Sequence, residues 1–260
     1  MSAIEIRELH DMAEFAQLYR VFDSIWHPEP GNPPVTVELM KVFSHSGSYV
    51  AGAFEGGEMV GGSVGLLAAG GSLHSHVTGA AIGRGIGLAL KYHQRDWALA
   101  RGLTTITWTF DPLVRRNARF NLVKLGAMPE EYLEGFYGEM ADAINEGDES
   151  DRLLAVWRLT GEREPYSLDG AVTGLAERDG LPHALPLDGA PGGAPDRAVG
   201  GATVLVATPP DIETLRRGDP GAGKAWRMAV RDVLGGLMRD GGSVVGFTDR
   251  GEYVVDLKQA

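Results

Sequence analysis

A strand, a glycine-rich turn and the start of a helix follow one another within residues 73–91, and this succession constrains the fold more than any other stretch. Residues 73–77 alternate in polarity as a strand does, and the small residues 78–81 suit a turn. The run Gly83-Arg84-Gly85-Ile86-Gly87 then leads into residues 88–92, which have good helix propensity. Glycine lets the backbone approach a bound group closely, and the first amides of a helix lack partners within it. The stretch therefore predicts a backbone cradle for a phosphate.

The spacing of the glycines distinguishes between known kinds of phosphate-binding turn. A dinucleotide fingerprint requires a third glycine where Leu88 stands, and a Walker-type loop requires a Lys-Ser/Thr pair that this turn lacks. The run from Val77 to Leu88 resembles the pyrophosphate-binding motif of the GCN5-related N-acetyltransferase (GNAT) superfamily. Ile82 departs from that motif, because the family usually has Arg or Gln there, and this leaves the contact to the backbone amides. The plain alternative is a turn that only joins a strand to a helix.

Charge and composition narrow the class of protein. The net charge of −11 over 260 residues argues against a protein that coats nucleic acid. Residues 81–124 nevertheless contain eight Lys and Arg and two Asp, a net of +6 that leaves −17 for the rest. A basic segment that begins at the glycine-rich turn suits a polyanionic cofactor, although solvated helix faces would give similar charges.

Several kinds of site and location are not expected. The chain has no Cys, which excludes disulfides and thiolate metal sites. No apolar run approaches the ~20 residues that span a bilayer, and the first residues lack the basic and apolar pattern of a secretory signal. We expect a cytoplasmic enzyme with neither a membrane nor a nucleic-acid partner.

The order of the predicted elements extends the resemblance over residues 3–159. Strands are predicted at 3–7, 48–54, 58–67, 71–77, 104–110, 132–137 and 153–159, and helices at 11–26, 36–44, 88–101 and 114–124. This order resembles the GNAT fold, which implies an α/β (α+β) class with a mixed central sheet, flanking helices and one splayed pair of strands. Residues 108–113 (WTFDPL), 116–118 (RNA), 120–121 (FN) and 124–126 (KLG) further resemble a branch of predicted acetyltransferases.

The predicted domains are a GNAT acyltransferase domain at 1–160, a Gly/Pro-rich linker at 161–201 and a small extension at 202–260. Six glycines and four prolines between residues 180 and 201 indicate the linker. Beyond it, residues 202–207 predict a strand, 224–239 an amphipathic helix, and 244–247 with 253–257 a hairpin. Since so few elements are rarely stable alone, we expect the extension to pack on the first domain or on a second copy of the chain in a homodimer.

The resemblance implies acetyl-CoA, or another acyl-CoA, as co-substrate and a primary amine of a small molecule as acceptor. The residues that it implies for cofactor binding are His76 and Val77 through their backbone at the thioester, Gly83, Arg84, Gly85, Ile86, Gly87 and Leu88 at the pyrophosphate, and Asn117 and Asn121 at pantetheine. The amine would attack the thioester directly, without a metal. Trp26, His27 and His74 are candidates for contact with the acceptor, although Trp26 equally fits the core.

Several residues are candidates for proton transfer. By the resemblance, His76 or the neighbouring His74 is a candidate general base, provided that the side chain lies within hydrogen-bond reach of the acceptor. Asp111 follows a buried strand at an end where ligands collect, although an aspartate before Pro112 also fits a turn. By the resemblance, the tyrosine that usually protonates the leaving thiolate falls on Leu122, so Tyr137 or Tyr132 would have to replace it. Leu122 and Ile82 therefore leave a rival interpretation, a non-catalytic acyl-CoA-binding or scaffold protein.

Three other patterns have simpler explanations. Residues 218–224 read G-x-x-x-x-G-K, but Ala225 stands where a Walker sequence needs a hydroxyl for magnesium, and helix capping explains the same letters. His74 and His76 share one face of a strand, but no third ligand is matched to them, so no metal is expected. The nine carboxylates of residues 130–151 suit a cationic acceptor but are more typical of a solvated surface.

Overall fold

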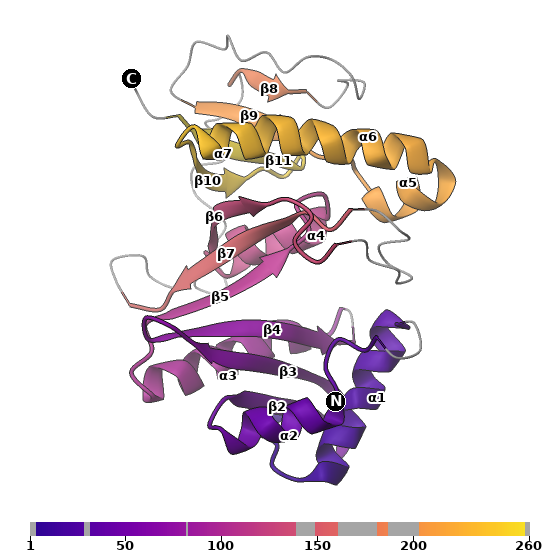
Figure 1. Ribbon diagram of the computed structural model, residues 1–260, viewed down its shortest axis with the longest axis vertical. Coiled ribbons are helices and arrows are strands. Elements are labelled where there is room, and N and C mark those ends of the chain that lie inside the picture. The colour runs from indigo at the N-terminus through magenta and orange to yellow at the C-terminus, as the bar shows by residue number, and fades with distance from the viewer. Residues whose placement is uncertain are drawn as a thin grey trace. The chain divides into compact units, whose positions relative to one another are not determined.

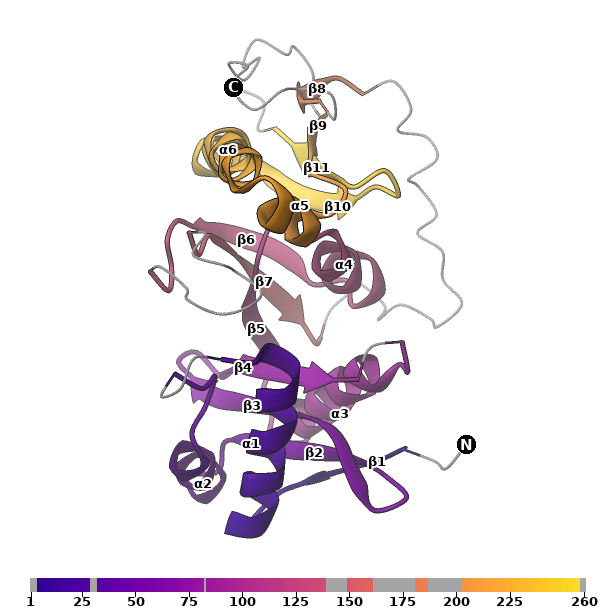
Figure 2. The same ribbon diagram turned by 90° about the vertical axis from the view of Figure 1, so that its right-hand side faces the viewer.

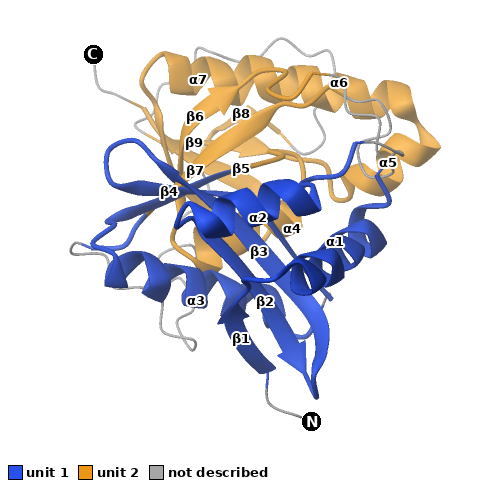
Figure 3. Cartoon of the chain, turned by 60° about the horizontal axis from the view of Figure 1, so that its bottom comes forward, with its two compact units in different colours: residues 1–108, 141–144, 158–160 blue, residues 109–140, 145–157, 161–260 orange. Residues whose placement is uncertain are grey.

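The computed structural model describes residues 4–28, 32–81, 83–138, 149–160, 181–186 and 203–257 (Figure 1). Contacts divide the chain into two compact units, with residues 1–108, 141–144 and 158–160 in the first and residues 109–140, 145–157 and 161–260 in the second (Figure 3). This division falls within strand β5 (Thr105–Phe110), whereas the predicted domain boundary lies at residue 160. In the described part of the chain, no helix combines the length and the apolar content that crossing a bilayer requires.

The first unit contains four antiparallel strands, a fifth strand parallel to the fourth, and three helices. They are β1 (Ile4–Glu8), α1 (Met12–Trp26), α2 (Val37–His45), β2 (Tyr49–Glu55), β3 (Glu58–Ala68), β4 (Ser72–Ala80), α3 (Ile86–Ala100) and most of β5. The complete sheet has seven strands in the order β1-β2-β3-β4-β5-β7-β6.

Helices α1 and α3 cover opposite faces of the strands in this unit (Figure 2). Leu18 of α1 lies so close to Gly62 of β3 that an added Cβ there would overlap it, while Gln94 of α3 donates to the Oγ of the next residue, Ser63, at 3.2 Å. Successive residues of a strand point to opposite faces, so the two contacts place one helix on each side. Both faces of β2 are correspondingly buried from Tyr49 to Phe54.

The helix starts of α1 and α2 follow directly from their capping residues. The Asp11 carboxylate accepts the Glu14 amide at 2.9 Å, and the Thr36 hydroxyl accepts the Leu39 amide at 3.2 Å. Along α1, Phe15, Leu18 and Phe22 are buried at the predicted helical spacing. The predictions for both helices are confirmed to within two residues.

The second unit combines part of the main sheet with a separate four-stranded sheet, in the order β10-β11-β9-β8. Its elements are α4 (Arg115–Ala118), the π-helix η1 (Arg119–Lys124), β6 (Met128–Leu133), most of β7 (Arg152–Arg158), β8 (His183–Leu185), β9 (Thr203–Ala207), α5 (Ile212–Gly218), α6 (Pro220–Val230), the π-helix η3 (Arg231–Gly235), α7 (Gly236–Arg239), β10 (Ser243–Phe247) and β11 (Glu252–Asp256). The apolar residues of β9 and β11 are almost fully buried and form much of this unit's core.

Residues 203–256 fold directly against residues 109–138 and 149–157 within this unit. The Tyr253 hydroxyl donates to the carbonyl oxygen of Pro112 at 2.8 Å, and Arg115 Nε donates to Thr208 Oγ1 at 3.2 Å. Arg119 forms an ion pair with Asp249. The C-terminal extension thus shares a compact unit with the second half of the predicted acyltransferase domain.

Three predicted element boundaries require correction. Strand β4 continues to Ala80 instead of ending at residue 77, because residues 78–80 remain paired with β3. Strand β6 spans Met128–Leu133, earlier than the predicted 132–137, and a register shift beside Pro129 accommodates the proline. The helix predicted at 224–239 starts at Pro220 and passes through η3, and the one at 114–124 passes through η1. Of the predicted linker, only residues 181–186 are described, and they include β8, which pairs in parallel with β9.

Candidate functional site

Strands β4 and β5 run parallel for a short distance and then part. In the described part of the chain they pair at Ser72–Thr105, Leu73–Ile106 and His74–Thr107, although β4 continues to Ala80 and β5 to Phe110. The residues that follow the last pair, Ser75 and Trp108, therefore stand at the point where the strands separate. Among the described residues no β4–β5 pair follows this point, so backbone groups of β4 from Ser75 onward are open to a ligand on that edge.

A β-bulge lies at the same point of β4. Pairing with β3 steps from Val64–Val77 to Gly65–Ser75, which leaves His76 as an extra residue. The bulge changes the alternation of side chains, because Ser75 and Thr78 both contact residues on the α3 side. The extra residue of a bulge has no regular place in the ladder, so the backbone of His76 is left for other partners.

The glycine-rich turn after β4 presents the bare N-terminus of α3. Gly83 and Gly85 have φ of 82° and 72°, a left-handed conformation that glycine adopts without strain. Gly85 is the N-cap, no side chain caps the helix, and its first turn contains no acidic residue. A Cβ added at Gly83, Gly85 or Gly87 would meet nothing within 4 Å. The first amides of a 15-residue helix thus face open space, as an anion site requires.

The side chains beside this turn contribute little to it. Arg84 forms an ion pair with Glu55 of β2, and both groups are partly exposed. Such surface pairs are weak, so the guanidinium can exchange its carboxylate for a phosphate at small cost. Ile82, where the family usually has Arg or Gln, lies outside the described residues. The turn therefore fits a pyrophosphate through backbone amides, and the parted strands beyond it suit an extended chain with amide groups, such as pantetheine.

A buried polar group that the sequence analysis does not predict lies on the α3 side of the point where β4 and β5 part. We call it the Lys91 cluster: Ser63, Ser75, Thr78, Lys91 and Gln94. Lys91 Nζ donates to Ser75 Oγ at 2.9 Å and lies 3.8 Å from the centre of the Trp108 ring. Burial lowers the pKa of Lys91 to about 7. The signal for it was available, since Lys91 falls on the buried face of α3 with Ile86, Leu90 and Gln94.

Stability should depend on pH through Lys91. Between about 7 and 10.5, the folded and ordinary pKa values, the unfolded chain holds a proton that the folded protein lacks. Stability therefore rises with pH in that window, by up to about 1.4 kcal/mol per pH unit. Urea unfolding of wild type and Lys91→Met at several pH values measures this effect. The free energy of unfolding of the wild type should rise relative to that of the variant as the pH rises. A stability difference that stays constant over this window would contradict the assignment.

The two histidines of β4 have different surroundings. His74 Nδ1 lies 3.0 Å from Thr107 Oγ1, and burial, together with the nearby His76 and Lys91, lowers the pKa of His74. His76 is exposed, and its Nε2 donates to the carbonyl oxygen of Pro34 at 2.9 Å. In the described part of the chain, no group of three His, Asp or Glu side chains is arranged to hold a metal ion. A neutral imidazole at His74 can accept a proton at neutral pH.

Trp26 and His27, predicted to contact the acceptor, lie at the C-terminal end of α1. Trp26 packs on the core cluster of the first unit, edge-on to Phe22, with 5.4 Å between the centres of the two rings. A Cβ added at Gly79 of β4 would overlap the Trp26 ring. His27 ends the helix with φ of 44°, and its amide donates to the Asp23 carbonyl oxygen at 2.9 Å. The core alternative for Trp26 is therefore observed, while a role in acceptor binding stays a prediction for both residues.

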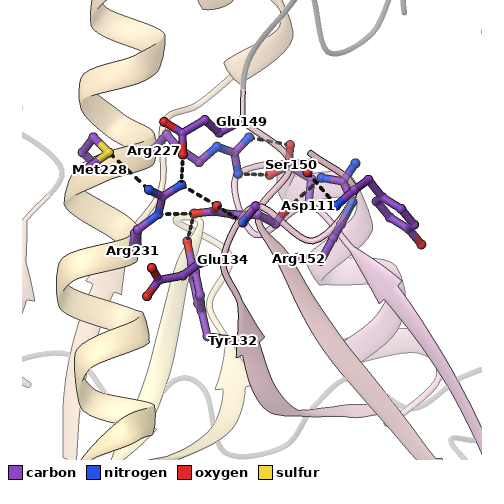
Figure 4. A network of polar contacts seen from close by, with 12 residues as sticks. Asp111, Tyr132, Glu134, Glu149, Ser150, Arg152, Arg227, Met228 and Arg231 are labelled. Carbon is purple, nitrogen blue, oxygen red and sulfur yellow. Dashed lines mark hydrogen bonds and ion pairs between the residues drawn. The ribbon is translucent and has the colours of Figure 1, made fainter. Parts of the chain in front are cut away.

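Asp111 belongs to a buried ion cluster of the second unit (Figure 4). Its carboxylate accepts bonds from Arg227 at 2.9 Å and from Arg216 at 2.8 Å, and the Leu113 amide donates to Oδ1 at 2.9 Å. Burial alone would raise the pKa of Asp111, but the Arg227 and Arg216 guanidiniums hold it well below its usual range. A carboxylate held ionised in this way is a poor proton acceptor. The turn alternative is observed, and the catalytic role stays a prediction that this geometry does not favour.

The other predicted residues of the second unit are described within that unit alone. The Tyr137 hydroxyl lies 3.0 Å from Thr109 Oγ1, with 44% of the residue exposed. Tyr132 is a poor substitute for the missing acid, because burial and the nearby Asp151 carboxylate raise its pKa. Asn121 in η1 is buried and Asn117 in α4 is half-buried. The cofactor and catalytic roles of Asn117, Asn121 and Tyr137 stay predictions.

The Walker-like run at residues 218–224 joins α5 to α6. Asp219 is the N-cap of α6, and its carboxylate accepts the Ala222 amide at 2.9 Å. An acidic group therefore stands at the helix start where a phosphate would have to lie. Helix capping, the alternative given in the sequence analysis, therefore explains this run.

Comparisons with known proteins identify the fold. No protein-family model matches the sequence, and no curated protein matches it either. An N-acetyltransferase from Staphylococcus aureus Mu50 superposes with a TM-score of 0.51 at 14% identity, over 61% of this chain and 100% of its own. A GNAT-family protein from Desulfovibrio desulfuricans superposes with a TM-score of 0.49 at 16% identity, over 61% of this chain and 100% of its own. A protein from Salmonella typhimurium, solved with its cofactor acetyl-CoA, superposes with a TM-score of 0.49 at 16% identity, over 64% of this chain and 99% of its own. The predicted fold class is confirmed: the chain has the acyl-CoA N-acyltransferase (GNAT) fold.

Proposed function

We propose that this protein is an acyl-CoA-dependent N-acyltransferase that transfers an acyl group, most simply acetyl, to a primary amine of a small molecule. One observation carries the proposal. A single strand, β4, parts from its parallel neighbour, bulges at His76 and leads through an open glycine turn to the uncapped N-terminus of α3. An anion site and an extended slot with free backbone groups thus follow one another along one element.

Each part of this element has a role in the proposed reaction. The amides from Gly83 to Leu88 would hold the pyrophosphate, since unpaired amides and the helix dipole both favour an anion. The backbone at His76 and Val77 would hold the thioester and donate to its carbonyl oxygen as charge develops there. Acyl-CoA, when bound, supplies an acyl group activated as a thioester. The protein's main contribution is then to hold donor and acceptor together in one orientation.

Proton removal from the attacking amine is assigned to β4. His76 is exposed on the strand next to the proposed thioester position, and the general base must be a group within hydrogen-bond reach of the amine. The lowered pKa of His74 keeps its imidazole neutral, which suits a second acceptor of the proton or a contact to the amine. Trp26 and His27 remain the proposed contacts of the acceptor on the α1 side.

The rival function is a protein that binds acyl-CoA without catalysis, and Leu122 favours it because leucine cannot protonate a leaving thiolate. Release of free thiol from acetyl-CoA distinguishes the two. The protein should release thiol in proportion to acylated product with at least one member of a panel of amino acids, polyamines and aminoglycosides. Calorimetric binding of acetyl-CoA without thiol release across the panel would support the rival. Failure to bind acetyl-CoA at all would contradict both.

A further inference from the structure

Lys91 reaches the point where β4 and β5 separate. The last paired residues of the two strands are His74 and Thr107. Lys91 contacts the residue that follows on each strand, which is Ser75 on β4 and Trp108 on β5. Its Nζ donates to Ser75 Oγ at 2.9 Å and lies 3.8 Å from the centre of the Trp108 ring. One ammonium group thus bridges the two parting strands, one residue before the bulge at His76.

The surroundings of Lys91 are unusual for a purely structural lysine. The side chain is 4% exposed, and its hydrogen bonds run to the neutral acceptors Ser75 Oγ and Gln94 Oε1. Buried lysines are normally paired with a carboxylate, because an unpaired buried charge is costly. Among the described residues, the titratable group that faces Lys91 across the sheet is His74, whose own pKa is lowered in part by Lys91. An added negative charge at this point would be stabilised.

Lys91 can also both hold and release a proton near neutral pH. Burial lowers its pKa to about 7, whereas an ordinary lysine stays charged. Proton donors and acceptors work best when their pKa lies near the working pH. The group would lose this property if a carboxylate neutralised it, and neither hydrogen-bond acceptor of Nζ carries a charge.

We propose that Lys91 donates the proton that the coenzyme A sulfur takes up when the acyl group is transferred. The inference rests on the proposed function and adds the general acid that Leu122 does not supply. The amine nitrogen forms a bond to the acyl carbon, and the carbon–sulfur bond breaks with its electron pair on sulfur. The ammonium of Lys91 gives one proton to that sulfur, and the amine nitrogen loses one to the base on β4. Lys91 then regains a proton from solvent, and the base releases its proton to solvent.

The test measures the thiol of bound coenzyme A, without any acceptor amine. Calorimetry first establishes binding of coenzyme A to wild type, Lys91→Met and Lys91→Arg. The pKa of the bound thiol is then followed through the ultraviolet absorbance of the thiolate. Lys91→Arg, which stays charged throughout the titration, should lower that pKa by about one to three units relative to Lys91→Met, the usual effect of an opposite charge within ~4–6 Å. Wild type should lie between the two variants, because Lys91 itself loses its proton from about pH 7 upward.

The outcomes separate this inference from the proposed function. Equal thiol pKa values in Lys91→Arg and Lys91→Met, with both proteins binding coenzyme A, would overturn the role of Lys91 alone. No binding to wild type would overturn the proposed function and this inference with it. Lys91 acylated after incubation with acetyl-CoA, seen by mass spectrometry, would also overturn it, since the amine would then act as a nucleophile. If Lys91→Met fails to fold, Lys91 in the unaltered protein is titrated by NMR, and its pKa must rise when coenzyme A binds.

Discussion

Replacing Asp111 with alanine should destabilise the protein by about 3–5 kcal/mol, the usual loss when one partner of a buried ion pair is removed. Asp111 is 7% exposed, Arg216 4% and Arg227 0%. Both carboxylate oxygens accept hydrogen bonds from Arg227 at 2.9 Å, and Oδ2 also accepts one from Arg216 at 2.8 Å. Without the carboxylate, two buried guanidiniums lose this counter-ion, and water cannot replace it at so little exposure.

Denaturant unfolding of wild type, Asp111→Ala and a matched control measures this effect. Asp249→Ala is the control, because Asp249 also pairs with an arginine, Arg119, but its side chain is 79% exposed. An exposed pair contributes about 0–1 kcal/mol, so the control should unfold nearly as wild type does. A loss below about 1 kcal/mol in Asp111→Ala would mean that the cluster is not held by this carboxylate.

The same contacts make the C-terminal extension an integral part of the second unit. The two arginines on Asp111 come from α5 and α6, more than a hundred residues later in the chain. Arg231 of η3 donates to Asp151 beside β7 at 2.8 Å, in the same network (Figure 4). A chain that ends after residue 160 would lack the arginines that pair with these carboxylates. Loss of activity in such a truncation could come from loss of folding, so substitutions of single residues are better probes of function.

Local signals in the sequence were sufficient for most of the fold. Asp11 and Thr36 announce helix starts because their side chains cap the first turn, and Phe15, Leu18 and Phe22 mark the buried face of α1. The glycine turn after β4 was also predicted, since Gly83 and Gly85 have the positive φ that glycine adopts without strain. These features depend on neighbours within a few residues, which the sequence displays directly.

Features that depend on distant partners could not be predicted in this way. Residues 78–80 look like a turn because they are small, yet they pair with β3, and Gly79 is small because Trp26 packs against it. The bulge at His76 exists only in the register between two strands. Asp111 was read as a catalytic candidate because its arginine partners lie in a segment that showed no link to it. Lys91 was passed over because a lysine in a helix is usually on the solvated side.

Replacing Gly87 with glutamate should weaken coenzyme A binding by at least about a hundredfold. Gly87 is the second residue of α3, and a Cβ there meets nothing within 4 Å, so a side chain fits without disturbing the protein. The new carboxylate would stand among the amides proposed to hold the pyrophosphate. Two like charges ~4 Å apart at a surface repel by about 4 kcal/mol, more than the roughly 2.8 kcal/mol of a hundredfold change. Gly85 is a poorer target, since its φ of 72° would strain any other residue.

Calorimetric titration with coenzyme A measures the affinity, and Gly87→Gln is the matched control. Glutamine adds the same atoms without the charge, so any difference between the two variants reports the negative charge of the ligand at this turn. Either side chain should raise the stability of α3 slightly, since glycine in a helix costs about 0.5–1 kcal/mol. A thermal melt no lower than that of wild type would therefore exclude unfolding as the cause of lost binding. If Gly87→Glu binds coenzyme A as tightly as Gly87→Gln does, the pyrophosphate does not lie at this helix start, and the proposed thioester position along β4 loses its anchor.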